Sequence, residues 1–181
     1  MVAGDAAVGK DGDAGTQAVI EDAMTLEDDA RHIIDTTRYM SLGTVDPDGR
    51  ARVSPVYYAP DGYDVVYWMS GLEAQHSQNV LRQPEVSMAI FDSTVPIGGD
   101  VRAVYLKATA GRVPDDELAA CAPVACRARF PEQRQPFPVE WLYPPERLRL
   151  WRARVTEHSV HIRGSDPVYG TGIDSRRVIA L

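Results

Sequence analysis

The sequence has little of what assigns a protein to several familiar classes. Its two cysteines, Cys121 and Cys126, lie five residues apart and fit neither a CxxC redox pair nor a pair of metal ligands. Apolar runs are only a few residues long, which excludes a membrane-spanning helix. No glycine-rich phosphate loop follows a predicted strand. No charged-then-apolar leader opens the chain, so we expect a cytoplasmic protein. A zinc site would need ligands beyond the two cysteines, so we expect no metal site.

Basic side chains are also few, and nearly all of them are arginine. The formal net charge is −7, and residues 1–30 hold one basic and eight acidic side chains, so the remaining chain is neutral. A neutral body lacks the basic face that a nucleic-acid-binding protein needs. Lysine occurs only at Lys10 and Lys107. We therefore expect any bound anion to be held by arginine, histidine or backbone amides.

Composition divides the chain into a tail and one domain. Residues 1–24 are rich in alanine, glycine and aspartate and show no apolar periodicity, which predicts a disordered acidic tail. Residues 25–181 are long enough for a single domain, and an overall hydrophobic content of 44% is enough to form a buried core.

Hydrophobic periodicity predicts a mainly β domain with flanking helices. Helical spacing is found over residues 25–38, 73–83 and 115–130. Strands are expected over residues 39–45, 50–59, 63–70, 85–91, 101–113, 147–156 and 160–163. The turn sequences at 46–49 and 60–62 join the early strands as antiparallel hairpins. This order favours a small antiparallel barrel over a doubly wound parallel sheet.

Two regions qualify this assignment. Pro55 falls inside a predicted strand, which indicates a sheet edge or a bulge at that position. Residues 164–181 are rich in turn residues and give no pattern that predicts an element. His158 and His161 are three apart in what looks like a strand region, so their side chains should face opposite sides.

One strand-to-helix junction has the features of an anion site. A predicted strand ends at Ser70-Gly71, and the next helix begins within a few residues. Free backbone N–H groups and the helix dipole favour an anion there. Ser70, Gln75 and His76 add side-chain donors. The spacing alone favours a plainer interpretation than an anion site. In it, Ser70 caps the helix and Gln75 and His76 are exposed to solvent.

A longer series of sequence segments favours the anion site instead. The series consists of Arg52-Val53-Ser54-Pro55-Val56-Tyr57, then Trp68-Met69-Ser70, then Gln75-His76, then Gln83-Pro84-Glu85-Val86. In this order and spacing it resembles the pyridoxamine 5′-phosphate oxidase-like, flavin-binding split-barrel family. The resemblance covers residues 25–113 and extends more weakly to about residue 156.

The resemblance implies an antiparallel split β-barrel that dimerises and binds flavin mononucleotide (FMN) at the dimer interface. It assigns the phosphate to Arg52, Ser70, Gln75 and His76. It implies the following cofactor-binding residues: Arg52, Val53, Ser54, Tyr57, Met69, Ser70, Gln75, His76 and Trp151. Trp151 would reach the flavin of the partner subunit, and the alternative is a core or interface aromatic residue.

Two departures from the family pattern bear on function. The family's basic pair is Gln75-His76 here, so the phosphate site carries less fixed charge. The Arg-x-His substrate grip of the vitamin-forming oxidases is replaced by Thr156-Glu157-His158-Ser159, so pyridoxine or pyridoxamine phosphate is not the expected substrate.

The resemblance therefore predicts an FMN-dependent oxidoreductase acting on a small organic molecule. No acid, base or nucleophile stands out, so we assign no catalytic residue. One alternative is a deazaflavin-dependent reductase, with Arg127, Arg129 and Arg134 lining a wider groove. Another is a non-catalytic flavin- or haem-binding protein, with His76, His158 or His161 as the axial haem ligand.

Overall fold

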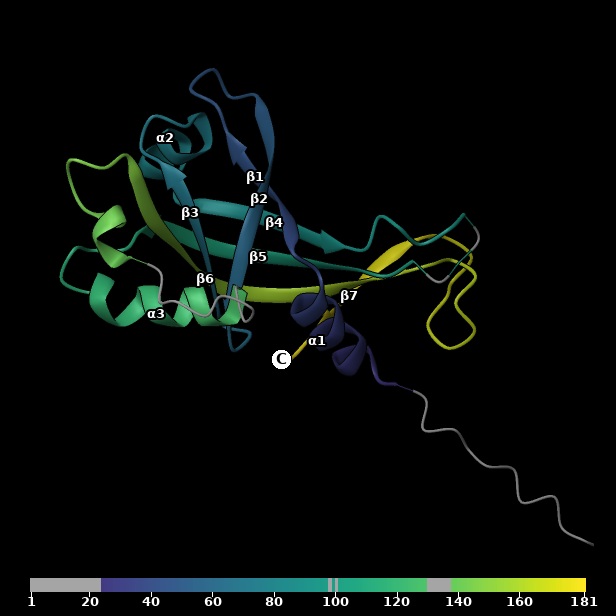
Figure 1. Cartoon of the computed structure of the whole chain (residues 1–181). Helices are drawn as coiled ribbons and strands as arrows, with labels where there is room; N and C mark the ends of the chain where they lie inside the picture. Colours follow the sequence, from purple (N-terminus) through teal and green to yellow (C-terminus); the bar gives the residue numbers. More distant parts are fainter. Residues whose placement is uncertain (1–23, 98, 100, 130–137) are drawn as a thin grey trace, which may run out of the picture.

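Hairpins and one long closing strand build the domain, in a computed structural model that describes residues 24–97, 99, 101–129 and 138–181 (Figure 1). The predicted tail, residues 1–24, lies outside the described residues except for Met24. The elements are α1 (Leu26–Thr36), β1 (Tyr39–Val45), β2 (Ala51–Asp61), β3 (Val65–Gly71), α2 (Gln75–Arg82), β4 (Glu85–Phe91), β5 (Ala103–Arg112), α3 (Leu118–Arg129), the 3-10 helix η1 (Val139–Leu142), β6 (Leu148–Ile162) and β7 (Ser175–Ile179).

The strands form one antiparallel sheet that closes on itself. Their order is β3-β2-β1-β4-β5-β6-β7, and β3 also pairs with β6. Strands β1 to β6 therefore make a closed barrel, with β7 added to the second half of β6. The predicted fold class, an antiparallel barrel with flanking helices, is confirmed.

The structure corrects the prediction of two strands near the carboxyl end. Strand β6 runs without interruption over 15 residues. Its pairing with β5 shifts from Lys107↔Glu157 to Ala108↔Val155, which leaves Thr156 as an extra residue. This β-bulge breaks the side-chain alternation without ending the strand. Strand β7, which the sequence did not predict, pairs with the part of β6 that follows the bulge.

A smaller correction concerns the second hairpin. The sequence placed its turn at Pro60-Asp61-Gly62, but Pro60 and Asp61 pair with Val66 and Val65 as the last residues of β2. The turn itself therefore starts at Gly62, whose φ of 57° is the left-handed conformation that glycine adopts without strain.

The barrel interior is the main core, and a helix lies at each end (Figure 1). Fully buried side chains inside it include Met40, Leu42 and Trp68. Helix α1 begins with a capping box between Thr25 and Asp28. It buries Leu26, Ala30 and Ile34 against one end of the barrel. Helix α2 lies at the opposite end, in contact with β1 and β5 (Figure 1).

A second apolar cluster lies outside the barrel. Helix α3 packs on β2, and the cluster joins Leu118, Ala122 and Ala125 of that helix to Tyr67 and Leu150 of the sheet. Alternation along β3 therefore points Tyr67 and Met69 outward, while Trp68 and Ser70 point into the barrel.

Strand β2 has an open edge over residues 51–57. Strand β1 pairs along its whole length there, but β3 pairs only with residues 58–61. Pro55 lies in this open part, which confirms the predicted edge position. On that side, residues 51–56 of β2 pair with no other strand among the described residues, so this part of the edge is available to a ligand.

Candidate functional site

The predicted phosphate residues meet where β3 ends and α2 begins. The Oγ of Ser70 lies 2.8 Å from Nε2 of His76. Ser70 is buried and His76 is half-buried. Burial, and to a smaller extent the nearby charge of Arg52, lowers the pKa of His76 below its usual value of 6.5. His76 is therefore neutral at neutral pH in the free protein.

Arg52 is held at the same end of the barrel by Asp46, from the turn between β1 and β2. Its Nε and Nη2 donate to the two Asp46 carboxylate oxygens at 2.7 and 2.9 Å. This bidentate pair, with a further hydrogen bond from Asn79, keeps the pKa of Asp46 below its usual value. The positive charge of Arg52 is thus largely balanced inside the protein.

Asn79 joins Gln75 to this ion pair. Its Nδ2 donates to Asp46 Oδ1 at 2.7 Å and to Thr44 Oγ1 at 3.0 Å, and its Oδ1 accepts from Gln75 Nε2 at 2.9 Å. Asn79 is fully buried, so this network fixes the first turn of α2 against β1. The structure brings Arg52, Ser70, Gln75 and His76 to one end of the barrel.

An aromatic cavity of about 460 Å³ opens on the outer side of β2 and β3. Its lining residues are Tyr39, Tyr57, Tyr58, Ala59, Tyr67, Trp68, Met69, Ala125 and Leu150. Tyr39 and Tyr57 meet edge to face, with ring centroids 4.9 Å apart. Burial, followed by a hydrogen bond with Cys121, raises the pKa of Tyr67 to about 12, so its phenol stays neutral. The volume and the lining suit a flat apolar ligand.

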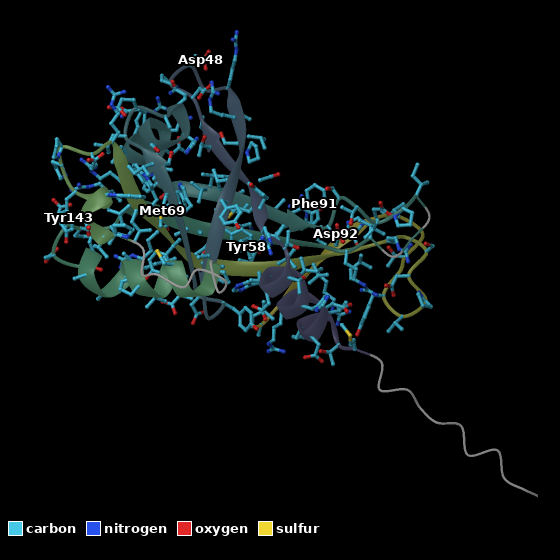
Figure 2. The ribbon with its side chains drawn as sticks, in the orientation of Figure 1. Asp48, Tyr58, Met69, Phe91, Asp92 and Tyr143 are labelled. Atoms are coloured by element: carbon cyan, nitrogen blue, oxygen red, sulfur yellow. The ribbon has the colours of Figure 1, made fainter. Side chains whose placement is uncertain are left out.

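The cavity and the polar cluster are adjacent. Met69 lines the cavity and Ser70, the next residue, belongs to the polar cluster. Met69, labelled in Figure 2, packs against the apolar cluster that α3 forms with the sheet. Because Met69 and Ser70 lie on opposite faces of β3, a ligand with an apolar ring and an anionic end reaches both surfaces by passing along the open edge of β2.

The remaining predicted residues divide into three cases. Ser54 is half-buried on the open edge of β2, two residues from Arg52 and on the same face. Val53 is 70% exposed and lines a groove on the outer face of the sheet, away from the aromatic cavity. Tyr57 and Met69, as described, line that cavity.

Trp151 is a core residue of its own chain. It has 0% exposure, and its ring stacks on Trp68 with centroids 6.3 Å apart. Its Nε1 donates to the backbone oxygen of Ser70 at 3.2 Å. With no exposed surface it offers nothing to a ligand bound by a partner subunit. These contacts fit the core role that was the alternative for this residue, and we leave it out of the candidate site.

Sequence reasoning missed Asp46 and Arg149. Asp46 belongs to a turn sequence and gave no sign of holding Arg52. Arg149 is 6% exposed and lies opposite Ser70 in the β3–β6 pairing. Its Nη1 donates to the backbone oxygens of Glu146 and Leu148 at 2.5 and 2.6 Å. Only the barrel closure reveals that this arginine shares a face with Ser70.

The other predicted ligands lie elsewhere. His158 Nε2 is 2.9 Å from the backbone oxygen of Tyr63, and His161 Nε2 is 3.7 Å from Asp174. Neither histidine lines the aromatic cavity. Across the described ranges, no group of three or more metal-ligating side chains is found, and no helix is long and apolar enough to cross a membrane. The side chains of Arg127, Arg129 and Arg134 lie outside the described residues.

Solved structures with the same fold bind different cofactors according to their names. A haem-binding protein from Mycobacterium smegmatis is 23% identical, over 82% of this chain and 56% of its own, with a TM-score of 0.59. A FAD-binding protein from Mesorhizobium loti is 16% identical, over 73% of this chain and 91% of its own, with a TM-score of 0.56. An F420 reductase is 21% identical, over 71% of this chain and 94% of its own, with a TM-score of 0.51.

The chain thus spans little more than half the length of the haem-binding protein that it matches. No curated protein matches the sequence. The family model described as pyridoxamine 5′-phosphate oxidase matches residues 26–144, from α1 through strands β1 to β5 and α3 to just past η1. With its closed antiparallel barrel and this match, the chain belongs to the pyridoxamine 5′-phosphate oxidase family.

Proposed function

We propose that the protein is an FMN-dependent oxidoreductase acting on a small organic molecule. The observation that carries this proposal is the adjacency of the aromatic cavity to the polar cluster at the start of α2. Met69 and Ser70 are consecutive, yet one lines the cavity and the other contacts His76. An isoalloxazine ring and a phosphate need these two surfaces next to each other.

The residues of this chain would divide the cofactor between them. Tyr57 and Met69 would contact the ring, while Ser70, Gln75, His76 and Arg52 would surround the phosphate. The negative phosphate would raise the pKa of His76 and make it a cation. When bound, FMN supplies the hydride or electron transfer, and the protein supplies binding and orientation.

The substrate would be other than a pyridoxine phosphate. The position of the family's substrate grip is occupied by Glu157-His158-Ser159 in β6. His158 is buried and bonded to the backbone of Tyr63, so it is not free to hold a second phosphate.

We also propose that the protein works as a homodimer with FMN at the interface. The exposed side chains of Val53 and Val178 line one groove on the outer face of the sheet. Exposed apolar side chains gathered in a groove are typical of interaction surfaces. This face begins at the open edge of β2, so a second subunit seated on it would border the ring.

The two alternative cofactors fit the described residues less well. A deazaflavin with a long acidic tail needs a basic groove, whereas Arg52 is already paired with Asp46. Haem needs an axial ligand, and no described histidine lines the aromatic cavity.

The absorption and fluorescence spectra of the purified protein test the three cofactors together. FMN would give flavin bands and flavin fluorescence, a deazaflavin would give blue-shifted bands, and haem would give a Soret band. Mass spectrometry of the released cofactor identifies it. If the protein is colourless, titration with FMN and riboflavin tests whether it binds a flavin phosphate. We expect FMN to bind more tightly than riboflavin. A Soret band with no flavin affinity would contradict it.

A further inference from the structure

The polar cluster lacks the positive charge that a phosphate dianion requires. Arg52 is neutralised by Asp46, and His76 is neutral in the free protein. Arg82 points its guanidinium at the backbone oxygen of Val45, and Asp46 lies close to it as well. Gln75 brings no charge. Among these residues, the site would therefore rest on hydrogen bonds and on a proton taken up by His76.

Arg149 is the uncompensated cation beside this cluster. Its side chain is more than nine-tenths buried and forms no ion pair with any described carboxylate. Its Nη1 is bonded to two carbonyl oxygens, but its buried Nε has no partner in the described part of the chain. A buried charge without a counter-ion is costly for the folded state. Such a group is expected where a ligand supplies the missing anion.

The barrel pairing places Arg149 beside Ser70. The two residues are directly opposite in the antiparallel β3–β6 pair, so their side chains leave the sheet on the same face. Ser70 in turn contacts His76 at the start of α2. Arg149, Ser70 and His76 thus belong to three different elements that converge at one end of the barrel.

We propose that Arg149 is a phosphate-binding residue of this protein and supplies from β6 the charge that Gln75-His76 does not provide. This inference rests on the proposed function, because the phosphate is taken to be that of FMN. A guanidinium suits the role because its planar donors match phosphate oxygens. The unpartnered Nε is the donor left free for them.

The test compares Arg149→Met with Arg154→Met, a matched change at an exposed arginine of the same strand. FMN and riboflavin, which has no phosphate, are each titrated into the parent and both variants. Losing a charge-assisted hydrogen bond should weaken FMN binding by roughly 10- to 150-fold in Arg149→Met. Riboflavin binding should stay nearly unchanged, and Arg154→Met should behave as the parent. Arg149→Lys should lose part of the FMN affinity, since it keeps the charge without the planar donors.

Stability measurements keep the result interpretable. Without ligand, Arg149→Met should melt no lower than the parent, because it removes an unpaired buried charge. If Arg149→Met keeps the parent's FMN affinity, or loses FMN and riboflavin equally, the inference is overturned while the proposed function stands.

If the parent binds neither flavin, the proposed function fails. The role of Arg149 is then tested by measuring melting temperatures with and without inorganic phosphate. A melting temperature that phosphate raises in the parent but not in Arg149→Met supports an anion site at Arg149. No increase in the parent overturns it.

Discussion

His76 illustrates how one side chain can couple ligand binding to pH. Burial lowers its pKa in the folded, ligand-free protein. As pH falls through about 6.5, the unfolded chain then takes up a proton more readily than the folded one. The stability that neutral His76 contributes is present above this pH and is lost below it. A bound phosphate reverses the preference, because it favours the protonated ring.

We therefore predict that His76→Ala weakens FMN binding by roughly 10- to 150-fold and changes riboflavin binding much less. In the parent, FMN affinity should increase as pH falls from about 8 to about 6.5, since binding takes up a proton at His76. In His76→Ala this increase should largely disappear. Fluorescence titrations at several pH values measure both effects. An unchanged pH profile in the variant would show that His76 does not contact the phosphate.

Ser70→Ala is the companion variant at this site. Its hydroxyl is 2.8 Å from the His76 ring, so the two side chains share one environment. Each single change and the double change should be measured together, because contacting residues are not expected to contribute additively. Gln75 donates its side-chain hydrogen bond to Asn79 rather than to the other phosphate residues, so it is left out of this set of variants.

At the scale of elements, barrel closure depends on β3 and β6. The stacked rings of Trp68 and Trp151 lie where these strands pair, both fully buried. We predict that Trp151→Ala lowers the free energy of unfolding by about 3–5 kcal/mol, the usual cost of emptying a large core position. Urea unfolding followed by circular dichroism measures this loss.

Trp151→Phe separates the core role from a contact with a partner's flavin. It should fold with a smaller loss of stability and should keep the parent's FMN affinity, because the ring is inside its own barrel. A folded Trp151→Phe protein with a large loss of FMN affinity would return this residue to the binding site.

Helix α3 gives the second prediction at this scale. Ala125 is 3% exposed and lines the aromatic cavity from α3. In Ala125→Leu the added atoms should enter the cavity, so FMN and riboflavin should both lose affinity, on the order of tenfold. Ala119→Leu, at an exposed position of the same helix, is the control and should bind both as the parent does. A loss confined to FMN would place the ring somewhere other than this cavity.

The elements also show what sequence patterns can and cannot reveal. Hairpin turns and alternation gave β1 and β4 with their correct bounds, because local chemistry determines them. The bulge in β6 interrupts the alternation of side chains, so the sequence pattern predicts that the strand ends there. Arg149 became part of the candidate site only through the pairing of β3 with β6, which joins residues far apart in the chain. Long-range pairing of this kind leaves no local pattern.

At the scale of the whole molecule, the outer face of the barrel carries a groove with exposed apolar side chains. Val53 is 70% exposed beside Ser87 of β4 and Val178 of β7 in one groove. These residues come from separate strands and are small or apolar. A second copy of the chain seated on this face would bury Val53 and border the open edge of β2, so assembly and flavin binding should be linked.

We predict a sedimentation mass near twice the 19.9 kDa of the chain. Val53→Asp should shift the protein toward a mass near that of one chain, because a buried carboxylate in the interface would lack a partner. Flavin content should fall together with the dimer, since the ring would lose the cover of the second subunit. Val168→Asp is the matched control, at a residue that is 74% exposed and lies outside the groove. It should leave both mass and flavin content unchanged. A parent protein that sediments as a monomer with FMN bound would contradict the dimer and would mean that one barrel completes the site.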